Sequence, residues 1–258
     1  MTTSESMAAR ESGTDGDEVF GSDIADRARA LMARYPRSRS ALLPMLHLVQ
    51  SVEGYVSQRG IAFCADQLGL ATAEVSAVAT FYTMYKRRPC GEHLVSVCTN
   101  TLCAALGGDD IYARLGEHLG SEGRPLGHEE TSGVPGKRGS ITLEHAECLA
   151  ACDFGPVLQV NYEYYDNQTP DSALQLVKSL QAGEKPPPTR GAPLTDFRTV
   201  ERQLAGFFEG QGGSLEDTVN GPSASAETVR GAKIAEERSW TAPPMPDSVE
   251  FPPLADKK

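Results

Sequence analysis

The sequence predicts an α/β protein made of a small N-terminal helical lobe followed by an open α/β domain. Apolar residues recur at helical spacing through residues 22–88, which favours a four-helix lobe. From residue 89 the pattern changes to the order strand, helix, strand, strand, helix, which is typical of an open α/β layer with few strands. Ten of the 17 prolines lie after residue 184, so the globular part is expected to end near residue 183.

The lobe is expected to contain four helices, at residues 23–35, 40–54 and 61–68 and from Thr72 onward. Pro36 ends the first helix, and Gly54 and Gly69 follow the second and third. The aromatic-rich end of the lobe is expected to pack between helices, with a partner surface as the second interpretation; it contains Phe81, Tyr82, Met84 and Tyr85.

The second domain, residues 89–183, is expected to contain three strands and two helices. The strands are predicted at residues 93–97, 140–143 and 157–162, and the helices at 104–119 and 171–180. Gly107 and Gly108 weaken the first turns of the first of these helices.

The two ends of the chain are expected to lack a core of their own. Residues 1–21 are polar and acidic, which predicts a disordered leader, and residues 184–258 are expected to form a Pro-rich extended tail. One piece of the tail has apolar residues on one helical face, and two interpretations stay open for it: a segment that orders on a partner, or a solvated tail with occasional apolar residues. The residues are Leu194, Phe197, Val200, Leu204 and Phe207.

Charge and hydropathy exclude several classes of protein. The formal charge of -11 disfavours nucleic acids and anionic membrane surfaces, and the helix-turn-helix-like stretch before Lys86 carries no basic residue for DNA. No apolar run is long enough to span a bilayer, and the acidic N-terminus does not resemble a secretory signal. A cytoplasmic location is therefore expected.

Four of the six cysteines form two pairs, Cys98 with Cys103 and Cys148 with Cys152. The first pair follows a predicted strand and opens a helix, and the second lies between two strands, so both pairs are expected at the same end of the sheet. Two pairs match the two thiolates that each iron of a 2Fe-2S cluster needs, and a helix N-terminus could offset the negative charge of the cluster. A four-cysteine structural zinc site stays open on spacing alone.

Other cysteine chemistry fits less well. A reducing compartment disfavours disulfides, no C-x-x-C redox motif is present, and His145 alone cannot complete a Rieske site. Cys64 lies at helical spacing between Ile61 and Leu68 and is expected in the core, and Cys90 is not expected to be a ligand.

The sequence resembles one known family over residues 22–182: the thioredoxin-like 2Fe-2S subunit of NADH-quinone oxidoreductase, or respiratory complex I. The matching stretches include VSAVATFYTMYKRRPCGEH, VSVCTNTLCAALGG and ECLAACDFGPVLQVNYEYYDNQTP. The resemblance implies a thioredoxin-like 2Fe-2S ferredoxin domain with Cys98, Cys103, Cys148 and Cys152 as cluster ligands. The stretch Phe154-Gly155-Pro156 departs slightly from the common family pattern.

The resemblance also implies a function in electron transfer. The chain is then a subunit of a proton-translocating NADH:quinone oxidoreductase, and the catalytic centre of that enzyme lies on another subunit. NADH and FMN are expected on a neighbouring flavin- and NADH-binding subunit, because this chain has no G-x-G-x-x-G after a strand. The large iron-sulfur subunit of complex I is the second expected partner, and the location is the cytoplasmic side of the membrane. The alternative is the equivalent subunit of a soluble NAD-linked hydrogenase or formate dehydrogenase.

Overall fold

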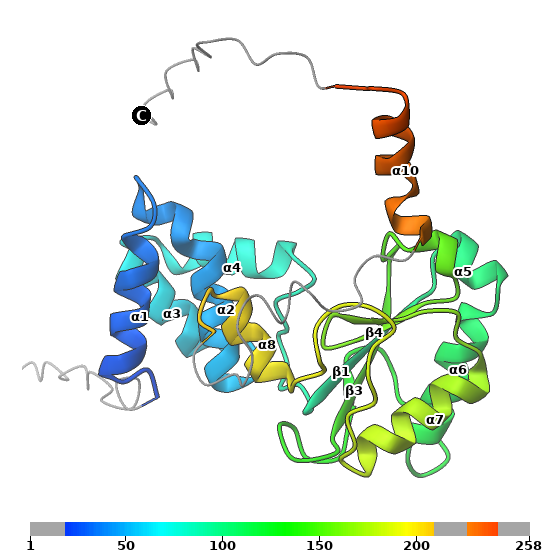
Figure 1. Ribbon diagram of the computed structural model, residues 1–258. Helices are drawn as coiled ribbons and strands as arrows, with labels where there is room; N and C mark the ends of the chain where they lie inside the picture. Colours follow the sequence, from blue (N-terminus) through cyan, green and yellow to red (C-terminus); the bar gives the residue numbers. More distant parts are fainter. Residues whose placement is uncertain (1–18, 209–225, 242–258) are drawn as a thin grey trace, which may run out of the picture. The chain divides into compact units, whose positions relative to one another are not determined.

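The computed structural model describes residues 19–208 and 226–241. It divides into two units, Met1–Pro222 and Ser223–Lys258, and the first contains both the helical lobe and the sheet (Figure 1). Most of the leader expected at residues 1–21 lies outside the described residues. In the part of the chain that is described, no helix combines the length and apolar character needed to cross a membrane.

The N-terminal lobe has the four expected helices. They are α1 (Ser22–Met32), α2 (Leu42–Glu53), α3 (Gln58–Leu68) and α4 (Thr72–Phe81), with a short 3-10 helix, Ser38–Ala41, before α2. Local chemistry fixes the ends of α3, where the Ser57 hydroxyl accepts the Gly60 N–H at 3.0 Å and Gly69 adopts a φ of 64°. Cys64 is buried among these helices, as predicted.

The aromatic residues after α4 pack differently from the expectation. Helix α4 ends at Phe81, which is 78% exposed, and Tyr82 is 45% exposed in an extended conformation. Tyr85 is buried, and its hydroxyl donates to the Leu43 carbonyl at 2.9 Å. The prediction of helix packing is therefore wrong for Phe81 and Tyr82, because Phe81 is on the exposed side of the last turn of α4 and the chain leaves the helix at Tyr82.

A mixed five-stranded sheet forms the second domain, in the order β2-β3-β1-β4-β5. Its strands are β1 (His93–Cys98), β2 (Glu130–Ser132), β3 (Ile141–Ala146), β4 (Leu158–Val160) and β5 (Glu163–Tyr165). Only β1 and β3 are parallel. The sequence did not predict the short strands β2 and β5. It also merged β4 with the turn at Asn161 and Tyr162, whose φ angles are positive.

Helices cover one face of the sheet: α6 (Gly108–Leu119) and α7 (Pro170–Gln181) pack over an apolar core that includes Val95, Val97 and Leu143 (Figure 1). The single helix expected at 104–119 is instead two helices, because α5 (Thr101–Ala105) ends before Gly107, whose φ is 107°. A Cβ on Gly108 would lie 2.5 Å from the Cys98 carbonyl oxygen, so the break lets α6 approach β1 closely.

The expected extended tail instead contains helix α8 (Phe197–Leu204), which packs on α2 of the same chain (Figure 1). Phe197 is fully buried against Leu94 and Cys90. Buried Glu201 accepts a hydrogen bond from the Tyr162 hydroxyl at 3.0 Å and lies 2.6 Å from His47 Nδ1. The predicted apolar residues are buried apart from Leu204, which is half-exposed, but they pack on this same chain: Phe207 on the lobe, Leu194 on the core of the α/β domain and Phe197 on Leu94 of β1.

The second unit contains helix α10 (Ala226–Glu237), also within the segment expected to be extended. Trp240 follows it and is exposed, with the Arg238 guanidinium 5.2 Å above its ring. This contact is a local cation–π interaction.

We expect Phe197→Ala to lower the free energy of unfolding by about 3–5 kcal/mol, because it leaves a cavity where α8 meets β1. Phe208→Ala is the matched control, since Phe208 is 43% exposed and its truncation is expected to cost about 0.5 kcal/mol or less. Urea unfolding of both variants measures the difference. Equal losses would contradict the anchoring role of α8.

Candidate metal centre

The parallel pairing of β1 and β3 brings the two cysteine pairs to one end of the sheet. In this register Cys98 is opposite Ala146, two residues before Cys148. Two hydrogen bonds join the loops that follow these strands: the Thr99 N–H donates to the Ala146 carbonyl at 3.1 Å, and the Asn100 side-chain amide donates to Glu147 at 2.9 Å. The loop positions are therefore fixed relative to each other by backbone pairing.

The first pair is buried: Cys98 and Cys103 are 1% and 2% exposed and pack with Ala151 and Val157. Cys98 is the last residue of β1, and Cys103 lies in α5. Burial raises the pKa of the Cys103 thiol to about 11, although the Val157 N–H, which favours the thiolate, opposes this rise. The Cys98 side chain raises the same pKa further, which indicates close contact between the two thiols.

The second pair is exposed, and its sulfur atoms are 3.6 Å apart. The Ala150 N–H donates to Cys148 Sγ at 3.4 Å, which is possible because Ala150 adopts a φ of 56°. The Cys148 side chain raises the pKa of Cys152, and Cys98 contributes in the same direction. Cys98 thus acts electrostatically on a cysteine of each pair, but among the described residues no three Cys, His, Asp or Glu side chains are arranged so that they could hold a metal ion.

The remaining two cysteines lie elsewhere. Cys64 is in the lobe core and Cys90 is buried near Lys86 and Thr142, and burial raises the pKa of each thiol to about 12. Neither is grouped with the four predicted side chains.

Aromatic and charged side chains brace the Cys148–Cys152 loop from the far edge of the sheet. The Tyr164 hydroxyl donates to the Leu149 carbonyl at 2.6 Å. The Arg190 guanidinium lies 3.9 Å above the Tyr164 ring and forms two hydrogen bonds to Asp166 at 3.0 and 3.1 Å. Sequence reasoning missed these residues because no local motif links Arg190 to a loop about forty positions earlier.

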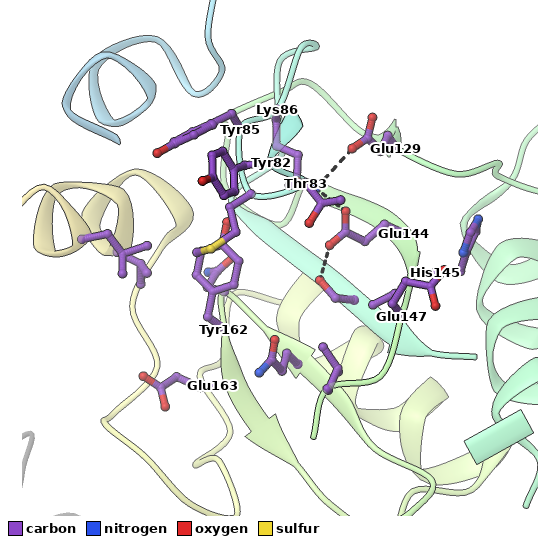
Figure 2. Close-up of a pocket in the computed structure, with 18 of the residues that line it drawn as sticks. Tyr82, Thr83, Tyr85, Lys86, Glu129, Glu144, His145, Glu147, Tyr162 and Glu163 are labelled. Atoms are coloured by element: carbon purple, nitrogen blue, oxygen red, sulfur yellow. Dashed lines mark hydrogen bonds and ion pairs between the residues drawn. The ribbon is translucent and has the colours of Figure 1, made fainter. Parts of the chain in front are cut away.

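A buried ionic network joins both cysteine-bearing strands to the helical lobe. Lys86 Nζ forms an ion pair with Glu144 on β3, and the Ser96 hydroxyl on β1 donates to the other oxygen of Glu144 at 2.6 Å (Figure 2). Burial alone would lower the pKa of Lys86, but the nearby Glu144 and Glu129 carboxylates outweigh it and raise the pKa. The Lys86 ammonium therefore stays charged and paired.

Comparison with known proteins identifies the class of this fold and site. A sequence model described as the thioredoxin-like 2Fe-2S ferredoxin matches residues 28–181. The chain belongs to the thioredoxin-like 2Fe-2S ferredoxin family. The helical lobe and the α/β domain predicted from the sequence are both present, and membership of this family supports an iron-sulfur cluster.

Within this family the chain is similar to subunits of NADH dehydrogenases. It is 52% identical to the NADH-quinone oxidoreductase E subunit of Mycobacterium tuberculosis over 86% of this chain and 83% of that protein. It is 29% identical to the mitochondrial NADH dehydrogenase (ubiquinone) flavoprotein 2 of Dictyostelium discoideum over 78% and 79% of the two chains. An NAD+-reducing NiFe-hydrogenase crystal structure matches 55% of this chain and 23% of its own, with 15% identity and a TM-score of 0.47.

We expect Lys86→Met to destabilise the protein by about 3–5 kcal/mol, because it leaves the Glu144 carboxylate buried without its cation. Arg124→Met is the matched control, since the Arg124–Glu130 pair is exposed and such pairs contribute about 0–1 kcal/mol. Urea unfolding of each variant measures the change. A loss for Lys86→Met no larger than that of the control would exclude a structural role for the network.

We expect Tyr164→Phe to loosen the Cys148–Cys152 loop, because the Leu149 carbonyl loses its donor at a cost of about 1 kcal/mol. The measurement is the rate at which purified protein loses iron to a chelator, which should rise several-fold. Tyr165→Phe removes a similar hydrogen bond, to the Pro186 carbonyl at 2.7 Å, away from the loop. Faster iron loss from Tyr165→Phe than from Tyr164→Phe would contradict the bracing role.

Proposed function

We propose that this chain holds one 2Fe-2S cluster through Cys98, Cys103, Cys148 and Cys152. The observation that carries the proposal is the parallel register of β1 and β3, which delivers one cysteine pair from the end of each strand. A 2Fe-2S cluster needs two thiolates on each iron, and this chain offers two pairs on two loops.

The chemistry of the donor set also supports the cluster. All four side chains are thiols, and backbone N–H groups of Ala150 and Val157 face sulfur atoms of the two pairs. Such N–H···S contacts stabilise thiolate charge and tune a bound cluster. Structural zinc sites most often use cysteines with two residues between them, whereas the gaps in this chain are four and three residues. The spacing therefore favours a two-iron site over mononuclear zinc.

We infer that the chain serves as an electron-transfer subunit in the NADH dehydrogenase module of a proton-translocating NADH-quinone oxidoreductase. The names of the relatives in Mycobacterium tuberculosis and Dictyostelium discoideum support this function. When bound, the cluster accepts and releases an electron; the chain itself positions it and sets its potential through burial and N–H donors.

The partners follow from this function. We propose that the neighbouring NADH-oxidising subunit binds FMN and NADH, and that the large iron-sulfur subunit of the complex is the second partner. The complex is placed on the cytoplasmic side of the membrane, with this chain attached as a peripheral subunit. The alternative is that this chain is the equivalent subunit of a soluble NAD-linked hydrogenase or formate dehydrogenase. The test below distinguishes this alternative from the main proposal.

We expect replacement of Cys98, Cys103, Cys148 or Cys152 by Ala to remove most of the cluster, because each iron loses a thiolate. The measurement is iron and acid-labile sulfide on anaerobically purified protein, with about two of each expected in the unaltered chain, and an EPR spectrum after reduction. Cys64→Ala and Cys90→Ala are the controls and should keep the cluster, since both thiols lie outside the site.

Three results would contradict parts of the proposal. Zinc without labile sulfide would make the site structural, and cluster loss in Cys90→Ala equal to that in Cys98→Ala would overturn the ligand set. Copurification with a soluble hydrogenase or formate dehydrogenase, without membrane subunits, would assign the chain to that class of complex.

A further inference from the structure

Arg190 lies in the segment that follows α7, and this segment runs alongside β5. The Thr189 N–H donates to the Tyr164 carbonyl at 2.8 Å, and Arg190 pairs with Tyr164 in an antiparallel bridge. The Tyr165 hydroxyl donates to the Pro186 carbonyl at 2.7 Å, which fixes the start of the segment. Residues 186–190 are therefore tied to the edge of the sheet, in a stretch for which the sequence predicts only an extended tail.

The Arg190 guanidinium contacts two aromatic rings that belong to the surroundings of the cysteines. Its central carbon lies 3.9 Å from the centroid of the Tyr164 ring and 5.2 Å from that of the Phe154 ring. Both distances are in the range of cation–π interactions. The two rings pack against the buried group that contains Cys98 and Cys103. Direct ring contacts therefore connect this cation to the cysteine site.

An ion pair holds the guanidinium in one orientation. Arg190 Nε and Nη2 donate to the two carboxylate oxygens of Asp166 at 3.0 and 3.1 Å, and the Thr189 hydroxyl donates to the same carboxylate at 2.9 Å. Such bidentate pairing fixes the plane of the guanidinium. The Arg190 and Asp166 side chains are only 19% and 8% exposed, so solvent and salt screen their charges weakly.

A fixed cation near a 2Fe-2S cluster changes its reduction potential. Uptake of one electron makes the cluster more negative by one charge, so a nearby cation favours the reduced form and a nearby carboxylate favours the oxidised form. The formal charge of this chain is -11, which disfavours a further negative charge. Because the guanidinium is the member of the ion pair that contacts the rings, its charge is expected to outweigh that of Asp166 at the cysteine site.

We propose that Arg190 raises the reduction potential of the cluster through the charge of its guanidinium, which Asp166 holds in place and partly offsets. Arg190 is a positioning residue, because it acts through the Tyr164 and Phe154 rings and is not a ligand. The inference rests on the proposed function, since it requires the cluster. It makes the segment after α7 part of the redox site, although no cysteine motif includes that segment.

The test compares two variants that break the same ion pair but change the charge in opposite directions. Arg190→Met removes the cation, and Asp166→Asn removes the anion while it keeps the shape of the side chain. The full chain, purified anaerobically, is reduced stepwise with dithionite, and EPR measures the reduced fraction. The potential should fall in Arg190→Met and rise in Asp166→Asn. Each change should alter the ratio of reduced to oxidised cluster by at least about threefold, or about 28 mV for one electron.

A role limited to holding the loop predicts a different result, because both variants lose the same ion pair. Shifts of the potential in the same direction in both variants, or a shift in neither, overturn the proposal. Arg190→Lys keeps the charge but not the bidentate pairing, and its ratio should stay within about twofold of the wild type. If Arg190→Met does not retain the cluster, Asp166→Asn decides: a raised potential supports the proposal, and an unchanged one overturns it.

Matched controls remove the same charges from an exposed ion pair at the opposite edge of the sheet. Arg124 pairs with Glu130 on β2, and the two side chains are 68% and 31% exposed. Arg124→Met and Glu130→Gln should each change the ratio by less than about twofold, because solvent screens exposed charges. Shifts as large as those of Arg190→Met and Asp166→Asn would show a general effect of net charge and overturn the assignment to Arg190.

Metal analysis of the wild-type chain separates this inference from the proposed function. A wild-type chain with iron and labile sulfide, whose potential does not respond to the Arg190 and Asp166 variants, keeps the proposed function and overturns the inference. A wild-type chain without labile sulfide contradicts the proposed function itself, and the inference is overturned with it.

Discussion

The ion pair between Lys86 and Glu144 is the constraint that connects the parts of this fold. Lys86 follows the helical lobe, Glu144 lies on β3, and Ser96 on β1 donates to the same carboxylate. The three residues lie on the sheet face away from α6 and α7, where, within residues 19–208, no helix of the α/β domain supplies apolar cover. A buried carboxylate in such a place is tolerated only while its cation and donor are both present, so the lobe and the two cysteine-bearing strands hold one another in position.

Much of this arrangement could be predicted from local sequence signals. Helical periodicity and the stop signals at Pro36, Gly54 and Gly69 were sufficient for the lobe, and β-branched runs located β1 and β3. The cysteine pairs were placed at one sheet end because both follow strands, and the structure has them there. The cysteine pairs meet at one end because β1 and β3 are parallel neighbours. The order of strands and helices along the chain leaves few other ways to pair these strands.

The remaining features depend on contacts between residues far apart in the chain. Helix α8 has a clear apolar face, but nothing local indicates that the face meets α2 about 150 residues earlier. The break at Gly107 reflects the close approach of Gly108 to the Cys98 carbonyl, which no helix-propensity argument contains. Arg190 and Tyr164 brace a loop that neither adjoins in sequence. Tertiary packing decided each of these features.

The two cysteine pairs differ in how they meet solvent, and this difference explains where a partner can act. Cys98 and Cys103 are enclosed by Ala151 and Val157, so any partner must approach from the side of Cys148 and Cys152. That side borders a cavity with several carboxylates, in a chain whose formal charge is -11. Within this cavity the Lys86 ammonium pairs with both Glu144 and Glu129, and these ion pairs are strong because the local dielectric is low. The exposed cysteine pair is therefore the accessible side of the site, and Lys86 keeps the carboxylates beside it neutralised.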